Sequence, residues 1–148
     1  MSLLRTALPP AQAVELERWL LSSGTDLRPM RVGLSAALTA YGLVGPAEPA
    51  ETGDRVILVA TELASNALRH GSPPAVVVLL RGAGEFLLDV ADHDPAGTPQ
   101  LAHVGHDGVG GRGLHIARTL SREMCWYRTD RTKHIWASFP TRADGAGG

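Results

Sequence analysis

The chain of 148 residues contains a single cysteine, Cys125. One thiol cannot form an internal disulfide, so a disulfide-stapled fold is excluded and a reducing compartment is expected. The sequence also lacks an apolar run long enough to span a bilayer. The residues after Met1 lead into prolines instead of the hydrophobic core of a signal peptide. We therefore expect a cytoplasmic protein with no membrane partner.

An excess of charge of one sign is also missing. The formal net charge of −1 gives no general basic field, so we expect no direct contact with nucleic acid. The composition, 44% hydrophobic and 20% charged, is typical of a soluble globular chain. The length is that of one domain. We expect a single domain over residues 1–142 and a flexible tail over residues 143–148.

Three helices are expected in the first half of the chain. The first covers Ala11–Leu21, and the second runs from about Arg28 to Tyr41 and ends at Gly42, a typical C-cap residue. The third covers Asp54–His70, where apolar residues recur at the spacing of one helical face. The core-facing residues of the first helix would be Val14, Trp19 and Leu20.

The hydrophobic period then changes to that of strands. Ala75–Leu80 is a continuous apolar run, and Gly82–Gly84 is a turn signal. Glu85–Asp92 is predicted to be a second strand, with Phe86, Leu88 and Val90 on one side. These two segments are expected to form a hairpin.

The last part of the chain begins with a long segment, His93–Gly111, that is rich in glycine and proline. Loops of this length are uncommon in a compact domain and are usually functional. A helix is expected over Arg112–Leu120, followed by strands over Met124–Thr129 and His134–Phe139. The order of elements predicts an α+β fold, a two-layer sandwich with helices on one face of a mainly antiparallel sheet.

Polar residues on the third helix form the first candidate site. Glu62, Asn66 and His70 are spaced i, i+4 and i+8, so they lie on one stripe beside the apolar face. An amide oxygen suits Mg²⁺, and a carboxylate one turn away could act on a hydroxyl or water. The alternative is a solvated helix face with a histidine placed at the negative end of the helix dipole.

Asp92 is the second candidate. By strand alternation it shares a face with Phe86, Leu88 and Val90, the face expected to be buried. A buried carboxylate needs a donor, and an adenine amino group would supply one. The alternative is that Asp92 only forms an Asx-type turn at the end of the strand.

The glycine run Gly108–Gly113 is the third candidate. It leads into a helix, so backbone N–H groups and the helix dipole could receive phosphates, and Arg112 could add a bidentate contact. The letters also match a dinucleotide-binding fingerprint, with Asp130 near the position of a ribose-binding acid. That interpretation requires a strand immediately before the glycines, and none is predicted there. A P-loop is excluded because the sequence contains no Gly-Lys-Ser/Thr.

Two further features point to structure more than to chemistry. His103 and His106 could bind a metal, but no second ligand pair with matching spacing accompanies them. Trp126 and Trp136 are expected in the core or in a dimer surface. Several basic residues are interpreted as solvated surface charges: Arg118, Arg122, Arg128, Arg131 and Lys133.

Taken in order, these elements resemble the anti-sigma-factor serine kinases of the GHKL ATPase superfamily. Thr61–Ala67 with Arg69–Gly71 looks like the N box of that family, and Asp92 falls where the first glycine-box aspartate contacts adenine. Gly110–Leu114 resembles the second glycine box, and Lys133–Ala137 looks like the closing strand. The specificity lies in the ordered combination, since each box alone is weak.

The resemblance implies a Bergerat sandwich that binds ATP and Mg²⁺. It makes Glu62 the general base, Asn66 the Mg²⁺ ligand and Arg112 a phosphate contact. The other nucleotide-binding positions it implies are Arg69, His70, Asp92, Gly110, Gly111, Gly113 and Leu114. The implied activity is phosphorylation of a serine on an anti-anti-sigma partner together with sequestration of a sigma factor, and a homodimer is possible.

The sequence departs from the family pattern at one place. The position two residues after Asp92, where the family has glycine, is Asp94, and Pro95 follows it. Two other functions stay open at this point. One is a nucleotide-binding module with little turnover, whose ATP state controls partner binding. The other is a small stand-alone ATPase.

Overall fold

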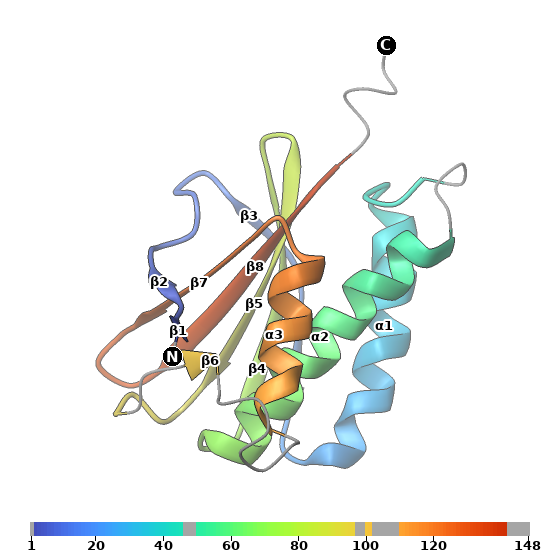
Figure 1. Cartoon of the computed structure of the whole chain (residues 1–148). Helices are drawn as coiled ribbons and strands as arrows, with labels where there is room; N and C mark the ends of the chain where they lie inside the picture. Colours follow the sequence, from blue (N-terminus) through green and yellow to red (C-terminus); the bar gives the residue numbers. More distant parts are fainter. Residues whose placement is uncertain (1, 46–49, 97–99, 102–109, 142–148) are drawn as a thin grey trace.

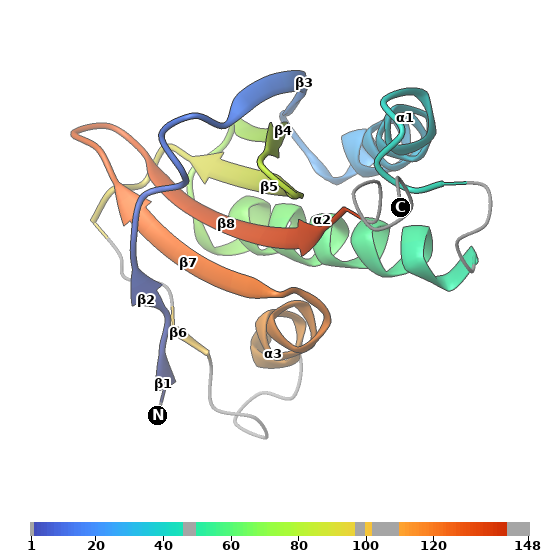
Figure 2. The ribbon, with the colours of Figure 1, turned by 90° about the horizontal axis from the view of Figure 1, so that it is seen from above.

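The computed structural model describes residues 2–45, 50–96, 100–101 and 110–141. In them a six-stranded sheet carries three helices on one face (Figure 1), and the view from above shows the two layers (Figure 2). The predicted flexible tail and the histidine pair of the glycine-rich segment lie outside the described residues. No helix in the described part of the chain is long and apolar enough to cross a membrane.

The first part of the chain corrects the sequence prediction. It forms strands β1 (Ser2–Leu3), β2 (Arg5–Thr6) and β3 (Val14–Leu21), and no helix covers Ala11–Leu21. β3 pairs antiparallel with β4 (Ala75–Gly82) along its length, and a register shift lies between its two glutamates. Long-range strand pairing here overrides a local sequence rich in helix-forming Glu, Leu and Arg.

The core residues expected from that helix change accordingly. Val14 is 60% exposed and Leu20 is 65% exposed. Leu21 is fully buried, and Trp19 packs against the core. The indole of Trp19 lies directly over Gly33, where a β-carbon would come within 2.6 Å of Nε1. Glycine at position 33 of the following helix therefore allows Trp19 of the edge strand β3 to pack closely against that helix.

The central elements agree with the prediction. A 3₁₀ turn, η1 (Gly24–Asp26), leads into α1 (Leu27–Ala40), and Gly42 adopts φ 69°, the left-handed conformation of a helix C-cap. Next come α2 (Ala50–His70), which begins four residues before its predicted start, and the hairpin of β4 with β5 (Glu85–Asp92).

The last elements are also close to those expected. Strand β6 (Gln100–Leu101) is a short piece of the glycine-rich segment and pairs with β1. Helix α3 (Gly110–Leu120) begins at the glycines, two residues before its predicted start. Strands β7 (Glu123–Arg128) and β8 (Lys133–Pro140) complete the sheet.

The sheet order is β2-β7-β8-β5-β4-β3. All neighbours are antiparallel except β2 and β7, which are parallel, so the sheet is mainly antiparallel as expected. The β5–β8 register sets Asp92 opposite Lys133 and Asp89 opposite Trp136. This register places the end of β5 beside the start of β8.

The two faces of the sheet are covered differently. The helices bury one face in the main core, which includes Trp126. The second face holds a smaller cluster of Leu87, Cys125 and Trp136, against which Ala7 and Ala13 of the N-terminal segment pack. The Trp136 indole N–H donates a 2.7 Å hydrogen bond to the carbonyl of Ala7. The burial of both tryptophans agrees with their expected place in the core.

Candidate functional site

The C-terminal half of α2 carries the predicted stripe. Glu62 and Asn66 are half-buried, whereas Arg69 and His70 are exposed at the end of the helix. Neither Glu62 nor Asn66 has a hydrogen-bond or ion-pair partner within the described part of the chain. A half-buried carboxylate and amide without partners are costly, so they are available to a ligand.

Asp92 lies at the end of β5, directly beside the end of α2. It is 4% exposed. Its carboxylate is so close to Gly71 that a β-carbon there would lie 2.7 Å from Oδ1 and overlap Cγ and Oδ2. The space beside Gly71, the residue after α2, is occupied by the acidic side chain, so a larger residue would not fit there without a shift. The fold brings the first two candidate sites together.

The two oxygens of Asp92 have different surroundings. Oδ1 accepts a 2.8 Å hydrogen bond from the backbone N–H of Asp94, so the Asx-type turn weighed from the sequence is present. Oδ2 lies 3.8 Å from Nζ of Lys133, which is 8% exposed. In the described residues, Oδ2 accepts no hydrogen bond. One carboxylate oxygen therefore orders the strand end, and the other can still accept a hydrogen bond.

Lys133 corrects the interpretation of the basic residues. The sequence grouped it with the solvated surface charges, but the structure buries it against Asp92. Position 133 meets that carboxylate only through the β5–β8 register, which is a long-range feature. The sequence signal that could have indicated the burial of Lys133 was its position at the start of the predicted closing strand.

The end of β5 is tied to the chain that follows α2. The backbone N–H of His93 donates a 2.8 Å hydrogen bond to the carbonyl of Ser72, and Nδ1 of His93 lies 2.9 Å from the carbonyl oxygen of Pro74. These bonds hold Asp92 against the end of the helix. The position of the carboxylate is fixed from both sides.

The first turn of α3 meets Glu62. Gly113 is buried, and a β-carbon there would overlap Oε1 of Glu62 and lie 3.4 Å from Cδ. The first N–H groups of a helix have no partner within it. The Glu62 carboxylate therefore lies at the positive end of α3, the end of a helix that favours anions.

The remaining glycine-box positions are only partly described. Gly110 and Gly111 belong to the first turn of α3, while the side chain of Arg112 lies outside the described residues. Leu114 is 3% exposed and packs in the main core, so any contact with a nucleotide would come from its backbone. Among the described residues, no three His, Cys, Asp or Glu side chains gather into a metal-binding group. The role of Asn66 as a metal ligand stays a prediction.

A second polar cluster, which the sequence did not predict, lies on the opposite face of β5. Oδ1 of Asp89 is 2.7 Å from Nδ1 of His134, and Oδ2 accepts a 3.0 Å hydrogen bond from the hydroxyl of Tyr127. The rings of Tyr127 and His134 stack at 4.3 Å. Burial raises the pKa of Tyr127, and the charge and hydrogen bond of Asp89 raise it further. Asp89 and Asp92 point to opposite faces of β5 because side chains alternate along a strand. This cluster is therefore not part of the α2–α3 site, the site formed by Glu62, Asn66, Asp92 and the first turn of α3.

Comparison with known proteins agrees with the fold. The family model described as "Histidine kinase-like ATPase domain" matches residues 20–139. No curated protein sequence matches the chain.

Two solved structures share the fold. The structure of the RsbU and RsbW domains of Rv1364c from Mycobacterium tuberculosis aligns with a TM-score of 0.58 and 16% identity over 85% of this chain. This chain spans 33% of the length of that one. The histidine kinase AdeS of Acinetobacter baumannii aligns with a TM-score of 0.50 and 11% identity, covering 85% of this chain and 68% of that chain. The family match runs from the last residues of β3 into β8 and includes every candidate site residue, and the chain belongs to the histidine kinase-like ATPase domain family.

Proposed function

We propose that this protein is an ATP- and Mg²⁺-dependent serine/threonine kinase of the anti-sigma-factor type, acting in the cytoplasm. The observation that carries the proposal is the placement of Asp92. A buried carboxylate lies against Gly71 at the end of α2, and one of its oxygens can still accept a hydrogen bond. That is the recognition group expected for the adenine amino group in this family.

The other end of the site supports phosphate binding. Glu62 faces the first turn of α3 from α2, Asn66 lies one turn further along α2, and Gly113 permits the close approach of the two helices. In this proposal Asn66 offers its amide oxygen to Mg²⁺, and the N–H groups of Gly110 and Gly111 bind phosphate oxygens. Bound Mg²⁺ would supply charge neutralisation on the phosphates.

Glu62 is the proposed general base. Its carboxylate has no cation partner among the described residues, so it can accept the proton of a serine hydroxyl. It also lies on a rigid 21-residue helix, which fixes its position relative to Asn66 one turn later. Arg69, His70, Arg112 and Leu114 remain proposed nucleotide contacts.

The proposed partners are an anti-anti-sigma factor as protein substrate and a sigma factor as the sequestered protein. The support is the ordered resemblance of the boxes and the fold shared with a structure that contains an RsbW domain. A homodimer is part of the same proposal. Sedimentation of the purified protein with and without ATP would test it.

Nucleotide binding can be tested with two buried aspartates on one strand. Asp92→Asn removes the carboxylate at the site, while Asp89→Asn makes the same change on the opposite face of β5. Titration calorimetry with ATP and Mg²⁺ should show a loss of affinity of about tenfold or more in Asp92→Asn, as expected for a hydrogen bond to a charged group. Asp89→Asn should bind as the wild type does. Equal affinity in both variants would show that adenine is not recognised by Asp92.

Phosphate transfer needs a separate test, because the alternative is a module that binds ATP with little turnover. Glu62→Gln should lower transfer to a serine-containing partner by about 10²–10⁴-fold while leaving ATP affinity nearly unchanged. Asn66→Ala should weaken binding only when Mg²⁺ is present. A wild-type protein that binds ATP and its partner but transfers no phosphate would support the module instead.

A further inference from the structure

A second cavity lies at the other end of the sandwich. It is lined by the first turns of α2, the end of α3 and the far ends of the central strands, including Val56, Leu120 and Phe86. Phe86 precedes Asp92 on β5 by six residues, which is about 20 Å along an antiparallel strand. The cavity is therefore separate from the α2–α3 site that contains Asp92.

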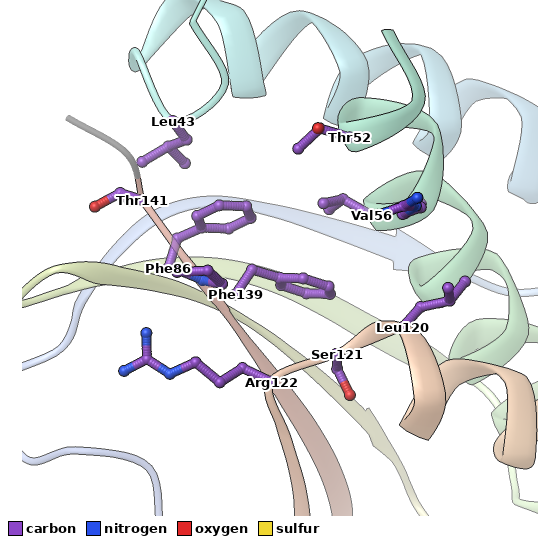
Figure 3. A pocket seen from close by; sticks show the side chains of 11 residues that line it. Leu43, Thr52, Val56, Phe86, Leu120, Ser121, Arg122, Phe139 and Thr141 are labelled. Atoms are coloured by element: carbon purple, nitrogen blue, oxygen red, sulfur yellow. The ribbon is translucent and has the colours of Figure 1, made fainter. Parts of the chain in front are cut away.

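The interior of this cavity is apolar. Its volume is about 520 Å³, within the range of small-molecule sites. The rings of Phe86 and Phe139 stack with centroids 5.2 Å apart and extend from the sheet into this space (Figure 3). Leu43, Val56 and Leu120 surround them. Stacked rings beside aliphatic side chains favour a flat apolar ligand.

Polar groups lie around this apolar floor. Hydroxyls come from the lining residues Thr52, Ser121 and Thr141. Two arginines also line the cavity, and they differ in their partners. Arg122 lies 3.7 Å from the carboxylate of Glu85, whereas Arg55 has no ion-pair partner in the described ranges. A guanidinium at the edge of an apolar cavity, with no carboxylate beside it among the described residues, favours a ligand that carries a carboxylate.

We propose that the cavity between α2, α3 and the Phe86–Phe139 pair binds a small aromatic carboxylate, with its ring on the two phenylalanines and its carboxylate on Arg55. The assignment follows from the combination of an aromatic floor with Arg55, which pairs with no carboxylate in the part of the chain that the structure describes. It goes beyond the proposed ATP-dependent function, because no residue of the cavity belongs to the nucleotide site.

The test uses three probes that share a naphthalene ring and carry a negative, neutral or positive group at position 2: 2-naphthoate, 2-naphthalenemethanol and 2-naphthylmethylammonium. Titrations of the full chain would be followed by the NMR signals of methyl groups at Leu43, Val56 and Leu120. The acid should shift these signals and bind more tightly than the alcohol, and the ammonium should bind most weakly. Arg55→Gln should weaken the acid about two- to fivefold and leave the alcohol unchanged, as expected for an exposed ion pair.

Arg118→Gln is the matched control. Arg118 is an exposed arginine on α3 that does not line this cavity, so the variant has the same charge change without the proposed contact. Affinity for 2-naphthoate should be unchanged in it. The proposal is overturned if acid and alcohol bind equally, or if the Arg55 and Arg118 variants weaken the acid equally. It is also overturned if the methyl signals do not move.

ATP affinity, measured on the same samples, separates this proposal from the proposed function. Arg55→Gln should leave ATP binding intact. Naphthoate that is displaced competitively by ATP would place the probe in the nucleotide site and reject the second site. A protein that binds naphthoate at the methyl groups but fails to bind ATP would reject only the proposed function.

Discussion

Replacing Gly71 with alanine would test the contact that joins α2 to Asp92. The new β-carbon would overlap the Asp92 carboxylate, so that side chain would have to move. Asp92 is 4% exposed, and its Oδ1 is held at 2.8 Å by the N–H of Asp94. The carboxylate cannot move far without losing this hydrogen bond.

The change in the free energy of unfolding caused by Gly71→Ala is the sum of two opposing effects. Losing a hydrogen bond to a charged group costs about 1.5–3 kcal/mol. Alanine lowers the conformational entropy of the unfolded chain relative to glycine, which stabilises the folded state by about 0.5–1 kcal/mol. The expected net loss is about 0.5–2.5 kcal/mol, or a fall in Tm of about 1–10 °C for a chain of this size. Gly71 does not have a positive φ, so backbone strain adds nothing to this difference.

Urea unfolding followed by circular dichroism would measure the loss, with Gly53→Ala as control. Gly53 lies on the same helix, and no atom lies within 4 Å of the position that a β-carbon would take there, so alanine should stabilise by about 0.5 kcal/mol. In an Asp92→Ala background, Gly71→Ala should cost nothing. A Gly71→Ala protein as stable as Gly53→Ala would refute the reasoning.

Three other predictions concern residues outside the proposed nucleotide contacts or beside them. Gly33→Ala should force the indole of Trp19 aside and cost about 1 kcal/mol in urea unfolding, despite the better helix propensity of alanine; unchanged stability would contradict the close approach. Lys133→Met should destabilise by about 2–4 kcal/mol because it leaves Asp92 buried without its cation. Asp92→Asn in that background should recover much of the loss, and a failure to recover would mean that packing dominates. The raised pKa of Tyr127 implies that the folded state keeps its proton after the unfolded state has lost it. Stability should therefore fall as the pH rises above about 10, the ordinary tyrosine value, and Tyr127→Phe should show a smaller fall when unfolding is compared at pH values on either side of it.

The sequence predicts the parts of this fold that have a local signal. The apolar face of α2 and the apolar residues of β5 are each visible within a single segment, and both elements were found at nearly the expected positions. The positions of Glu62 and Asp92 follow from them. The helix caps and turns with Gly42 and Gly84 were also predictable, since both glycines adopt positive φ.

The errors come from features that depend on distant partners. β3 contains helix-forming residues, and the register shift between Glu15 and Glu17 interrupts the alternation that would identify a strand. Only its pairing with β4 makes it a strand. Lys133 is likewise buried only because the β5–β8 register places it opposite Asp92. Neither long-range pairing is visible in one sequence.

The placement of the N-terminal strands at both edges of the sheet has a consequence for folding during synthesis. Arg5 of β2 pairs with Cys125 of β7, 120 residues later (125 − 5), whereas Leu21 of β3 pairs with Ala75, 54 residues later (75 − 21). At a synthesis rate of about 5–20 residues per second, β7 is synthesised about 6–24 s after β2. One edge can therefore form while the other still has no strand to pair with. β2 can pair only after β7 has been synthesised.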